Sequence, residues 1–267
     1  MISKGPSRTS PGMRVLAGVL AAGLGCGAAA GAPPNTAAFT PGTVPPANQP
    51  DISGDWVVTN FDPQGKTIDG KDPPLQKWAR DIADERFHTA AKGHPFPDTE
   101  TLCLTAGMPR IMFGPGSGAP IEILQTQGQV TLLFEVMHNM RFIYLTSKHS
   151  SLDDIDPSYH GESIGHWEGD TLVVDTIDLT DKTTIDKYGI PHSDALHLVE
   201  RIRRTGRDAL EDVVTMTDPK AFTAPWVYRA TYTRAPAGTR VQEFFCDNNR
   251  NPVDDKGTVL FKGNEKQ

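Results

Sequence analysis

The sequence predicts a mainly β fold: a single antiparallel up-and-down barrel, or a strongly bent sheet, of nine or ten strands with one N-terminal amphipathic helix. Three observations support this prediction. Short runs in which apolar and polar residues alternate follow one another through most of the chain. Turn sequences rich in Gly, Asp and Asn separate these runs. Only one segment has the apolar spacing of a substantial helix, so we expect consecutive strands to pair as neighbours.

Residues 1–32 predict a secretory signal peptide. The basic residues at its start are Lys4, Arg8 and Arg14. Residues 15–24 form an apolar run that is too short to span a bilayer, and small residues follow at 25–32. We therefore expect a periplasmic or secreted protein. The alternative is a lipid anchor at Cys26, although Gly23 stands where a lipobox has a large aliphatic residue.

Residues 33–50 contain six prolines and no charge, which predicts a linker, and residues 51–267 are expected to form the barrel domain. No segment after the leader approaches 18 consecutive apolar residues, so we expect no membrane span. Loss of the leader lowers Lys+Arg from 26 to 23 against 33 Asp+Glu, a net charge of about −10. A chain this acidic repels phosphate backbones, which excludes nucleic acid as a partner.

The first two elements are a strand and the helix. Residues 52–60 have the pattern of a strand. Residues 72–93 predict the helix, because Asp72 can cap its start and Gly93 can end it. The apolar side chains at helical spacing are Leu75, Trp78, Ala79, Ile82, Ala83 and Phe87. They give the helix one apolar face.

The remaining strands are expected mostly in hairpins. Residues 121–127 and 130–137 flank Gly128, and residues 163–167 and 171–177 flank a Glu-Gly-Asp turn. Further strands are expected at 140–146, 209–217, 226–234 and 240–246. The pattern at 195–204 fits a strand or a helix, and its strand neighbours favour the strand.

Two resemblances bear on the fold. Gly54 and Trp56 in the first strand resemble the opening of lipocalin-type barrels, in which the tryptophan closes one end of the barrel. Longer blocks resemble a family of secreted, largely uncharacterised bacterial proteins, above all WEGDTLVVDT at 167–176 and HSDALHLVER at 192–201. The second resemblance implies no particular activity. This chain departs from that family at 145–150, LTSKHS, where the family usually continues with Asp-Gly-Arg.

Two cysteines remain after the leader, Cys103 and Cys246. In an oxidising compartment an isolated pair most simply forms one disulfide. The alternative is two separate buried thiols.

The segment PHSDALHLVER at 191–201 supplies the main catalytic candidates. As a strand it places His197 on one face and Glu200 on the opposite, apolar face. A carboxylate there needs an Arg or His partner, or it stays protonated with a raised pKa. Because histidine is the natural base near neutral pH, we expect His192 or His197 as base, and Glu200 or Asp175 as acid or orienting group. The alternative is structural: His192 bonds a loop carbonyl, and Glu200 pairs with Arg203 or Arg141.

Charged residues on partly apolar faces favour a polar-lined cavity in the barrel. Arg141 is expected there as an anion clamp, or in the simpler alternative as the ion-pair partner of Glu135. The candidate ligand contacts are Arg141, Tyr144, Glu135, His138 and Arg201.

Other chemistries are disfavoured by the motifs. The spacing of His192, His197 and Glu200 matches neither a strand nor a helix metal site, so we expect no metal. The letters GESIG at 161–165 fit a serine-hydrolase motif, but they lead into a β-hairpin rather than a strand-to-helix turn. No phosphate-binding or dinucleotide motif is present, and we expect no cofactor.

The expected function is therefore an exported barrel that binds a small organic molecule in a polar-lined cavity, with cofactor-free acid–base catalysis of the lyase or isomerase type if it is an enzyme. One alternative is a non-catalytic periplasmic binding or carrier protein. Another is a structural envelope protein with internal ion pairs. The sequence specifies neither the ligand nor the oligomeric state.

Overall fold

The computed structural model describes residues 49–60, 65–97, 99–113, 119–146, 148–244 and 246. All of them belong to one compact unit. The expected signal peptide at 1–32 lies outside the described residues, as does nearly all of the expected linker. No helix within the described ranges is long and apolar enough to cross a bilayer.

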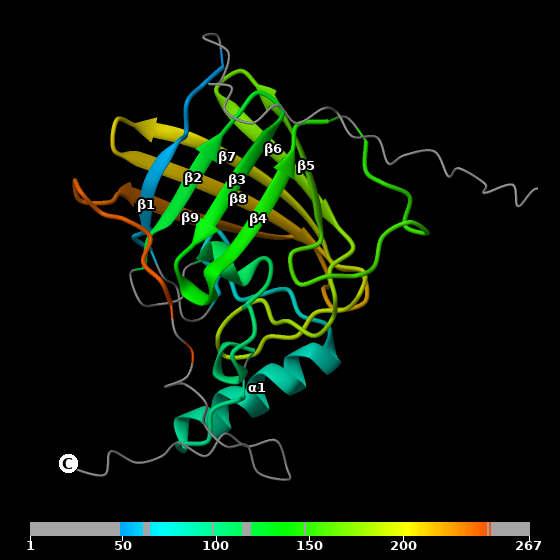
Figure 1. The fold of residues 1–267 in the computed structure, drawn as a ribbon. Coiled ribbons are helices and arrows are strands. Elements are labelled where there is room, and N and C mark those ends of the chain that lie inside the picture. The colour runs from blue at the N-terminus through cyan, green and yellow to red at the C-terminus, as the bar shows by residue number, and fades with distance from the viewer. Residues whose placement is uncertain are drawn as a thin grey trace, which may run out of the picture. The chain divides into compact units, whose positions relative to one another are not determined.

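Nine strands close into a barrel, as Figure 1 shows. In chain order they are β1 Gly54–Val58, β2 Ile121–Gln125, β3 Gln129–Phe134, β4 Asn139–Tyr144, β5 Glu162–Glu168, β6 Thr171–Ile177, β7 His197–Gly206, β8 Ala209–Thr217 and β9 Trp226–Arg234. Each strand pairs with the next, and β9 returns to pair with β1. The prediction of a mainly β closed barrel with one substantial helix is confirmed.

The seam between β4 and β5 differs from the rest of the wall. All other neighbours are antiparallel, but β4 and β5 run parallel. They share only two register pairs, Ile143 with Ser163 and Tyr144 with Ile164. Parallel neighbours need a crossover connection, and residues 145–161 supply it. The short pairing makes this seam the weakest part of the barrel wall.

The helix α1, Lys77–Ala91, begins five residues later than predicted. Pro73 and Pro74 do not start it, because the chain there is extended and Leu75 forms a β-bridge with Phe222. Gly93, at φ +86°, follows the helix end as expected. Figure 1 shows α1 beyond one end of the barrel.

The predicted apolar face of α1 is mostly not buried. Of the six predicted apolar residues only Ala79 and Leu75, which precedes the helix, are buried, while Trp78 and Phe87 are 41% and 51% exposed. Trp78 instead donates its indole N–H to the Lys220 carbonyl at 2.8 Å. The helix therefore adds little to the core, because the barrel encloses its own apolar face.

The Gly54–Trp56 pair lies at the point where the barrel closes. Trp56 is fully buried and donates its indole N–H to the Ile52 carbonyl at 3.0 Å. The Arg234 guanidinium lies 4.5 Å from the centre of the Trp56 ring. Gly54 adopts φ +122° against the Arg234 side chain, so a Cβ at this position would collide with it.

A short 3-10 helix, η2 (Arg110–Phe113), packs on the inward face of β9. All four of its residues are buried. Tyr232 donates its hydroxyl to the Met112 carbonyl at 2.6 Å, and the Phe113 ring lies 4.3 Å from that of Tyr228. These side chains fill barrel space that could otherwise hold a central ligand. The other 3-10 helices are η1 Glu100–Leu102 and η3 Val136–His138.

The strand predicted at 240–246 is wrong: residues 240–244 join no strand. Their backbone is held by side chains instead, because Glu135 accepts from the Gln242 N–H at 2.8 Å and His138 Nε2 accepts from the Phe244 N–H at 2.7 Å. A disulfide with an S–S distance of 2.08 Å joins Cys246 to Cys103. The segment is tied down at these points without sheet pairing.

Candidate functional site

Arg141 of β4 and Glu200 of β7 meet inside the barrel. Their side chains are 1% and 0% exposed. Arg141 Nη1 donates to Glu200 Oε1 at 2.8 Å, and Nη2 donates to Oε2 at 2.5 Å. The two strands are not neighbours, so the pair spans the barrel interior. Glu200 lies inward with an arginine partner, as the strand pattern predicts, and the alternative pairing of Arg141 with Glu135 is wrong.

Two hydroxyl groups take up the remaining donors of Arg141. Ser163 Oγ accepts from Nε at 3.2 Å and from Nη2 at 3.1 Å, and Thr176 Oγ1 accepts from Nη2 at 2.9 Å. The guanidinium charge is compensated by Glu200 and its donors are largely used. Arg141 therefore joins neighbouring strands of the barrel wall. It is not available as the anion clamp predicted from the sequence.

Asp212 of β8 lies in the same interior and is fully buried. Neither carboxyl oxygen makes a hydrogen bond of normal geometry with a described residue. Burial raises the pKa of Asp212 well above its usual range, and repulsion from the Glu200 carboxylate adds to this effect. Folding therefore favours the protonated form of Asp212 over the charged one.

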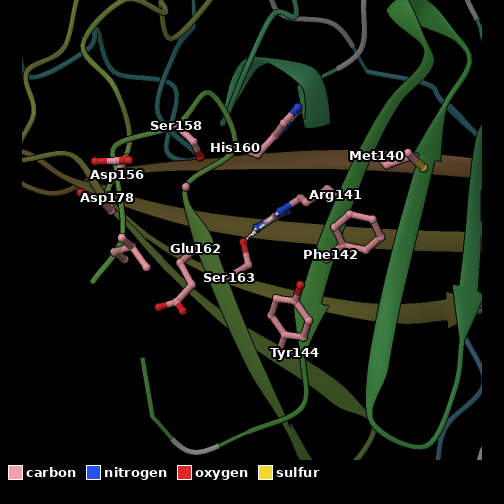
Figure 2. Close-up of a pocket in the computed structure, with 12 residues that line it drawn as sticks. Met140, Arg141, Phe142, Tyr144, Asp156, Ser158, His160, Glu162, Ser163 and Asp178 are labelled. Atoms are coloured by element: carbon pink, nitrogen blue, oxygen red, sulfur yellow. Dashed lines mark hydrogen bonds between the residues drawn. The ribbon is translucent and has the colours of Figure 1, made fainter. Parts of the chain in front are cut away.

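A pocket of about 400 Å³ opens through the wall beside the β4–β5 seam (Figure 2). Its floor includes Arg141 and Ser163. In Figure 2, Phe142 and Tyr144 lie on one side of this floor. A group of polar residues, Asp156, Ser158 and Asp178, lies on the other side. The pocket is thus apolar on one wall and polar on the other.

His160 lies above Arg141 in the pocket wall (Figure 2). Burial, and then the positive charge of Arg141, lower the pKa of His160 to about 4, so the ring is neutral at neutral pH. Its Nε2 faces the Thr105 hydroxyl at 3.4 Å. Its Nδ1 is buried and has no hydrogen-bond partner among the described residues. No motif in the sequence singles out this histidine.

Three carboxylates surround the polar side of the pocket. Asp178 adopts φ +59°, and its Oδ2 is buried without a hydrogen-bond partner in the described ranges. Burial raises the pKa of Asp178, and the nearby charges of Asp156 and Glu162 raise it further. Burial also raises the pKa of Glu162, but hydrogen bonds from Ser150 and His149 outweigh it and lower that pKa overall.

A chain of histidines and carboxylates runs over the outer face of the wall beside the pocket. His149 Nδ1 lies 2.8 Å from Glu162 Oε2, and its Nε2 lies 3.0 Å from Asp175 Oδ1. His197 Nε2 lies 2.9 Å from the same Asp175 oxygen. Sequence reasoning missed His149, although it lies in the LTSKHS segment that departs from the resembled family.

The expectation that Asp175 is internal is wrong. Val174 and Thr176 are the fully buried residues on either side of it, so Asp175 points outward and is 41% exposed. Val173, which shares a face of the strand with Asp175, suggested that this face is internal. Val173 is indeed buried, but on the outer side of the barrel wall.

The four predicted catalytic residues do not converge. His192 is buried in the loop before β7, where its ring nitrogens contact the Thr183 hydroxyl at 2.7 Å and the Ser193 carbonyl at 2.9 Å. Burial lowers the pKa of His192. His197 and Asp175 lie outside the barrel and Glu200 lies inside it. His192 thus has the structural role that the alternative gave it.

Of the five predicted ligand contacts, two line the pocket, Arg141 and Tyr144. Glu135 and His138 hold the C-terminal segment described above. Arg201 is on the outer face, where it donates to Glu168 at 2.8 Å. The sequence places Glu135, His138 and Arg201 in or beside strands that contain apolar residues. It does not show which part of the chain each of these side chains contacts.

Two further chemistries were weighed from the sequence. In the described parts of the chain, no group of three or more His, Cys, Asp or Glu side chains is arranged to hold a metal ion. Ser163, the serine of GESIG, lies within β5 and bonds Arg141 and the Thr176 hydroxyl at 2.9 Å. It has the position of a buried structural hydroxyl and not that of a nucleophile on a turn.

Comparisons with known proteins assign the chain to no family. No protein-family model and no curated protein matches the chain. Among solved structures it is similar to the fluorescent protein UnaG, with 14% identity and a TM-score of 0.32 over 69% of this chain and 97% of that one. An asparagine-to-alanine mutant of UnaG gives 14% identity, a TM-score of 0.33, and coverage of 69% and 96%. Similarity at this level says nothing about function.

The fold and the site together define a closed nine-stranded β-barrel with a pocket in its side wall. The resemblance to secreted bacterial proteins rests on the sequence blocks alone.

Proposed function

We propose that the protein binds a small organic molecule in the pocket beside the β4–β5 seam, and that the barrel is a non-catalytic scaffold for this binding. The pocket itself carries the proposal. Its volume of about 400 Å³ falls within the range of about 300–1,000 Å³ that is usual for ligand sites. Half-exposed aromatic side chains line it together with a few polar groups, such as Arg141 and Ser163, that hydrogen bonds hold in place. This is the usual composition of ligand sites.

Binding is favoured over acid–base catalysis because the predicted bases, His192 and His197, do not line this pocket. Catalysis of the lyase or isomerase type needs a base and an acid that converge on one reacting atom. Glu200 is taken up by Arg141, and His160, with a pKa of about 4, is a weak base. The carrier reading therefore fits the site better than the enzymatic one.

We also propose that the protein is exported. The basic start and short apolar run of residues 1–32 support this, and so does the Cys103–Cys246 disulfide, since such bonds persist in oxidising compartments. Mass spectrometry of the mature chain from the native host should find it cleaved near residues 30–32 in the periplasmic or extracellular fraction. An acylated Cys26 would indicate the lipid anchor, and an uncleaved cytoplasmic chain would refute export.

The binding proposal is tested by what the purified protein retains. The protein from its native host should carry a small molecule that denaturation releases for mass spectrometry. Ser158→Trp should lose it, because the indole fills the pocket that Ser158 lines. The control is Leu152→Trp, at a 63% exposed position of the same connection, which should retain it. Equal retention by the two variants, or no bound molecule in the wild type, would refute the proposal.

A further inference from the structure

The positive groups at the pocket cannot attract an anion. Arg141 is neutralised by Glu200 at two contacts of 2.8 and 2.5 Å, and most of its donors are used inside the protein. His160 is uncharged at neutral pH because its pKa is about 4. An anionic ligand would therefore meet no available positive charge among the described lining residues.

The negative groups are not neutralised in the same way. Glu162 is held by His149 and Ser150. Asp156 and Asp178 form no salt bridge with any residue in the described parts of the chain. Their mutual repulsion, together with burial, raises the pKa of Asp178. A positive ligand group between them would relieve this repulsion.

A further observation, independent of these charges, concerns the opposite wall. Phe142 and Tyr144 are 42% and 48% exposed there. Half-exposed aromatic rings that line a pocket offer an apolar surface to the body of an organic ligand.

We propose that the ligand is an organic cation: an ammonium group lies between Asp156 and Asp178, and an apolar body lies against Phe142 and Tyr144. This inference rests on the proposed function, because it names the ligand class of the same pocket. Figure 2 shows the carboxylates and the aromatic rings on opposite sides of Arg141 and Ser163, an arrangement that suits a molecule with one charged and one apolar end.

The test compares three probes of similar shape by calorimetric titration at neutral pH and low ionic strength: 2-phenylethylammonium, 2-phenylethanol and 3-phenylpropanoate. The cation should bind about fivefold more tightly than the alcohol, which is at the upper end of the contribution that a partly exposed ion pair makes to binding. The anion should bind most weakly. Ser158→Trp should abolish binding of all three probes.

Charge-removing variants assign the preference to the two aspartates. Asp156→Asn and Asp178→Asn should each weaken cation binding about fivefold and leave the alcohol unchanged. Asparagine tolerates the left-handed backbone of residue 178, so Asp178→Asn retains the fold. Asp153→Asn is the matched control, because this exposed carboxylate of the same connection does not line the pocket.

The outcomes separate the two proposals. Suppose that the alcohol binds to the wild type and that Ser158→Trp abolishes this binding. If the cation is then not preferred, or if the Asn variants have no effect on cation binding, the ligand class is wrong and the binding site stands. If no probe binds to the wild type, or Ser158→Trp leaves binding intact, the binding site itself is refuted together with the ligand class.

Discussion

Arg141 and Glu200 form an ion pair in the barrel core, and the polar groups around the pair contribute to its stability. Taking two charges out of water is costly, and their attraction offsets that cost only with good geometry and satisfied donors. The bidentate contact and the hydroxyls of Ser163 and Thr176 supply both conditions. A loss of either partner would leave a buried charge next to Asp212.

We expect Arg141→Ala to lower the free energy of unfolding by about 3–5 kcal/mol, because Glu200 then stays buried without its partner. Urea denaturation measures the change. Arg201→Ala, which breaks the exposed pair with Glu168, should cost less than about 1 kcal/mol. Comparable losses in the two variants would contradict the interior pairing. A Met–Leu replacement of the whole Arg141–Glu200 pair should recover much of the loss.

Asp212 should make stability fall as pH rises. Its folded pKa is raised above the unfolded value of about 4, so the protonated form stabilises the fold. This contribution is complete below the unfolded pKa and is lost as pH rises through the folded pKa. Asp212→Asn should remove it, so the variant should gain stability relative to wild type as pH increases. If the difference in stability between this variant and the wild type does not vary with pH, folding does not raise the pKa of Asp212.

At the scale of elements, the connection between β4 and β5 decides where the pocket is. Residues 145–161 cross from one parallel strand to the other and supply the polar side of the pocket. His149 fixes this connection to the barrel wall through Glu162 and Asp175. Each ring nitrogen of His149 lies against one of these carboxylates, so a single side chain joins the connection to two strands.

We expect His149→Ala to loosen this connection with a small loss of global stability, about 1 kcal/mol, because its partners are partly exposed. Hydrogen exchange followed by mass spectrometry should show faster exchange within 148–161 while β8 stays protected. His166→Ala removes an exposed contact with Glu168 and should not change exchange there. Unchanged exchange in His149→Ala would mean that other contacts hold the connection.

At the scale of the whole molecule, the Cys103–Cys246 disulfide joins parts of the chain 143 residues apart. It anchors the segment after β9 beside η1, a segment that forms no sheet pairing over its described residues 240–244. A link across so long a loop restricts the unfolded chain and so favours the folded one.

We expect Cys103→Ala with Cys246→Ala to lower the free energy of unfolding by about 5 kcal/mol, the size that chain entropy gives for so long a loop. The wild type unfolded in the presence of a reductant should match the double variant. If reduction has no effect on the wild type, the bond contributes nothing to stability.

The sequence by itself determined the barrel, because alternation and turn residues are local signals. The predicted limits of 171–177, 209–217 and 226–234 coincide with β6, β8 and β9. It also determined that Glu200 lies on an apolar face and requires a positive partner. It failed where distant contacts override local pattern: the bridge from Leu75 to Phe222 delays the helix, and side chains of η3 hold 240–244 out of the sheet.

Only the tertiary structure decided which residues make the site. Alternation assigns each residue to one of two faces, but barrel closure decides which face is inside and which strands lie across from one another. Arg141 therefore meets Glu200 across 59 residues, and Asp175 lies outside with His149. The pocket lies beside the seam where two neighbouring strands run parallel with only two register pairs, and no local pattern in the sequence records that pairing.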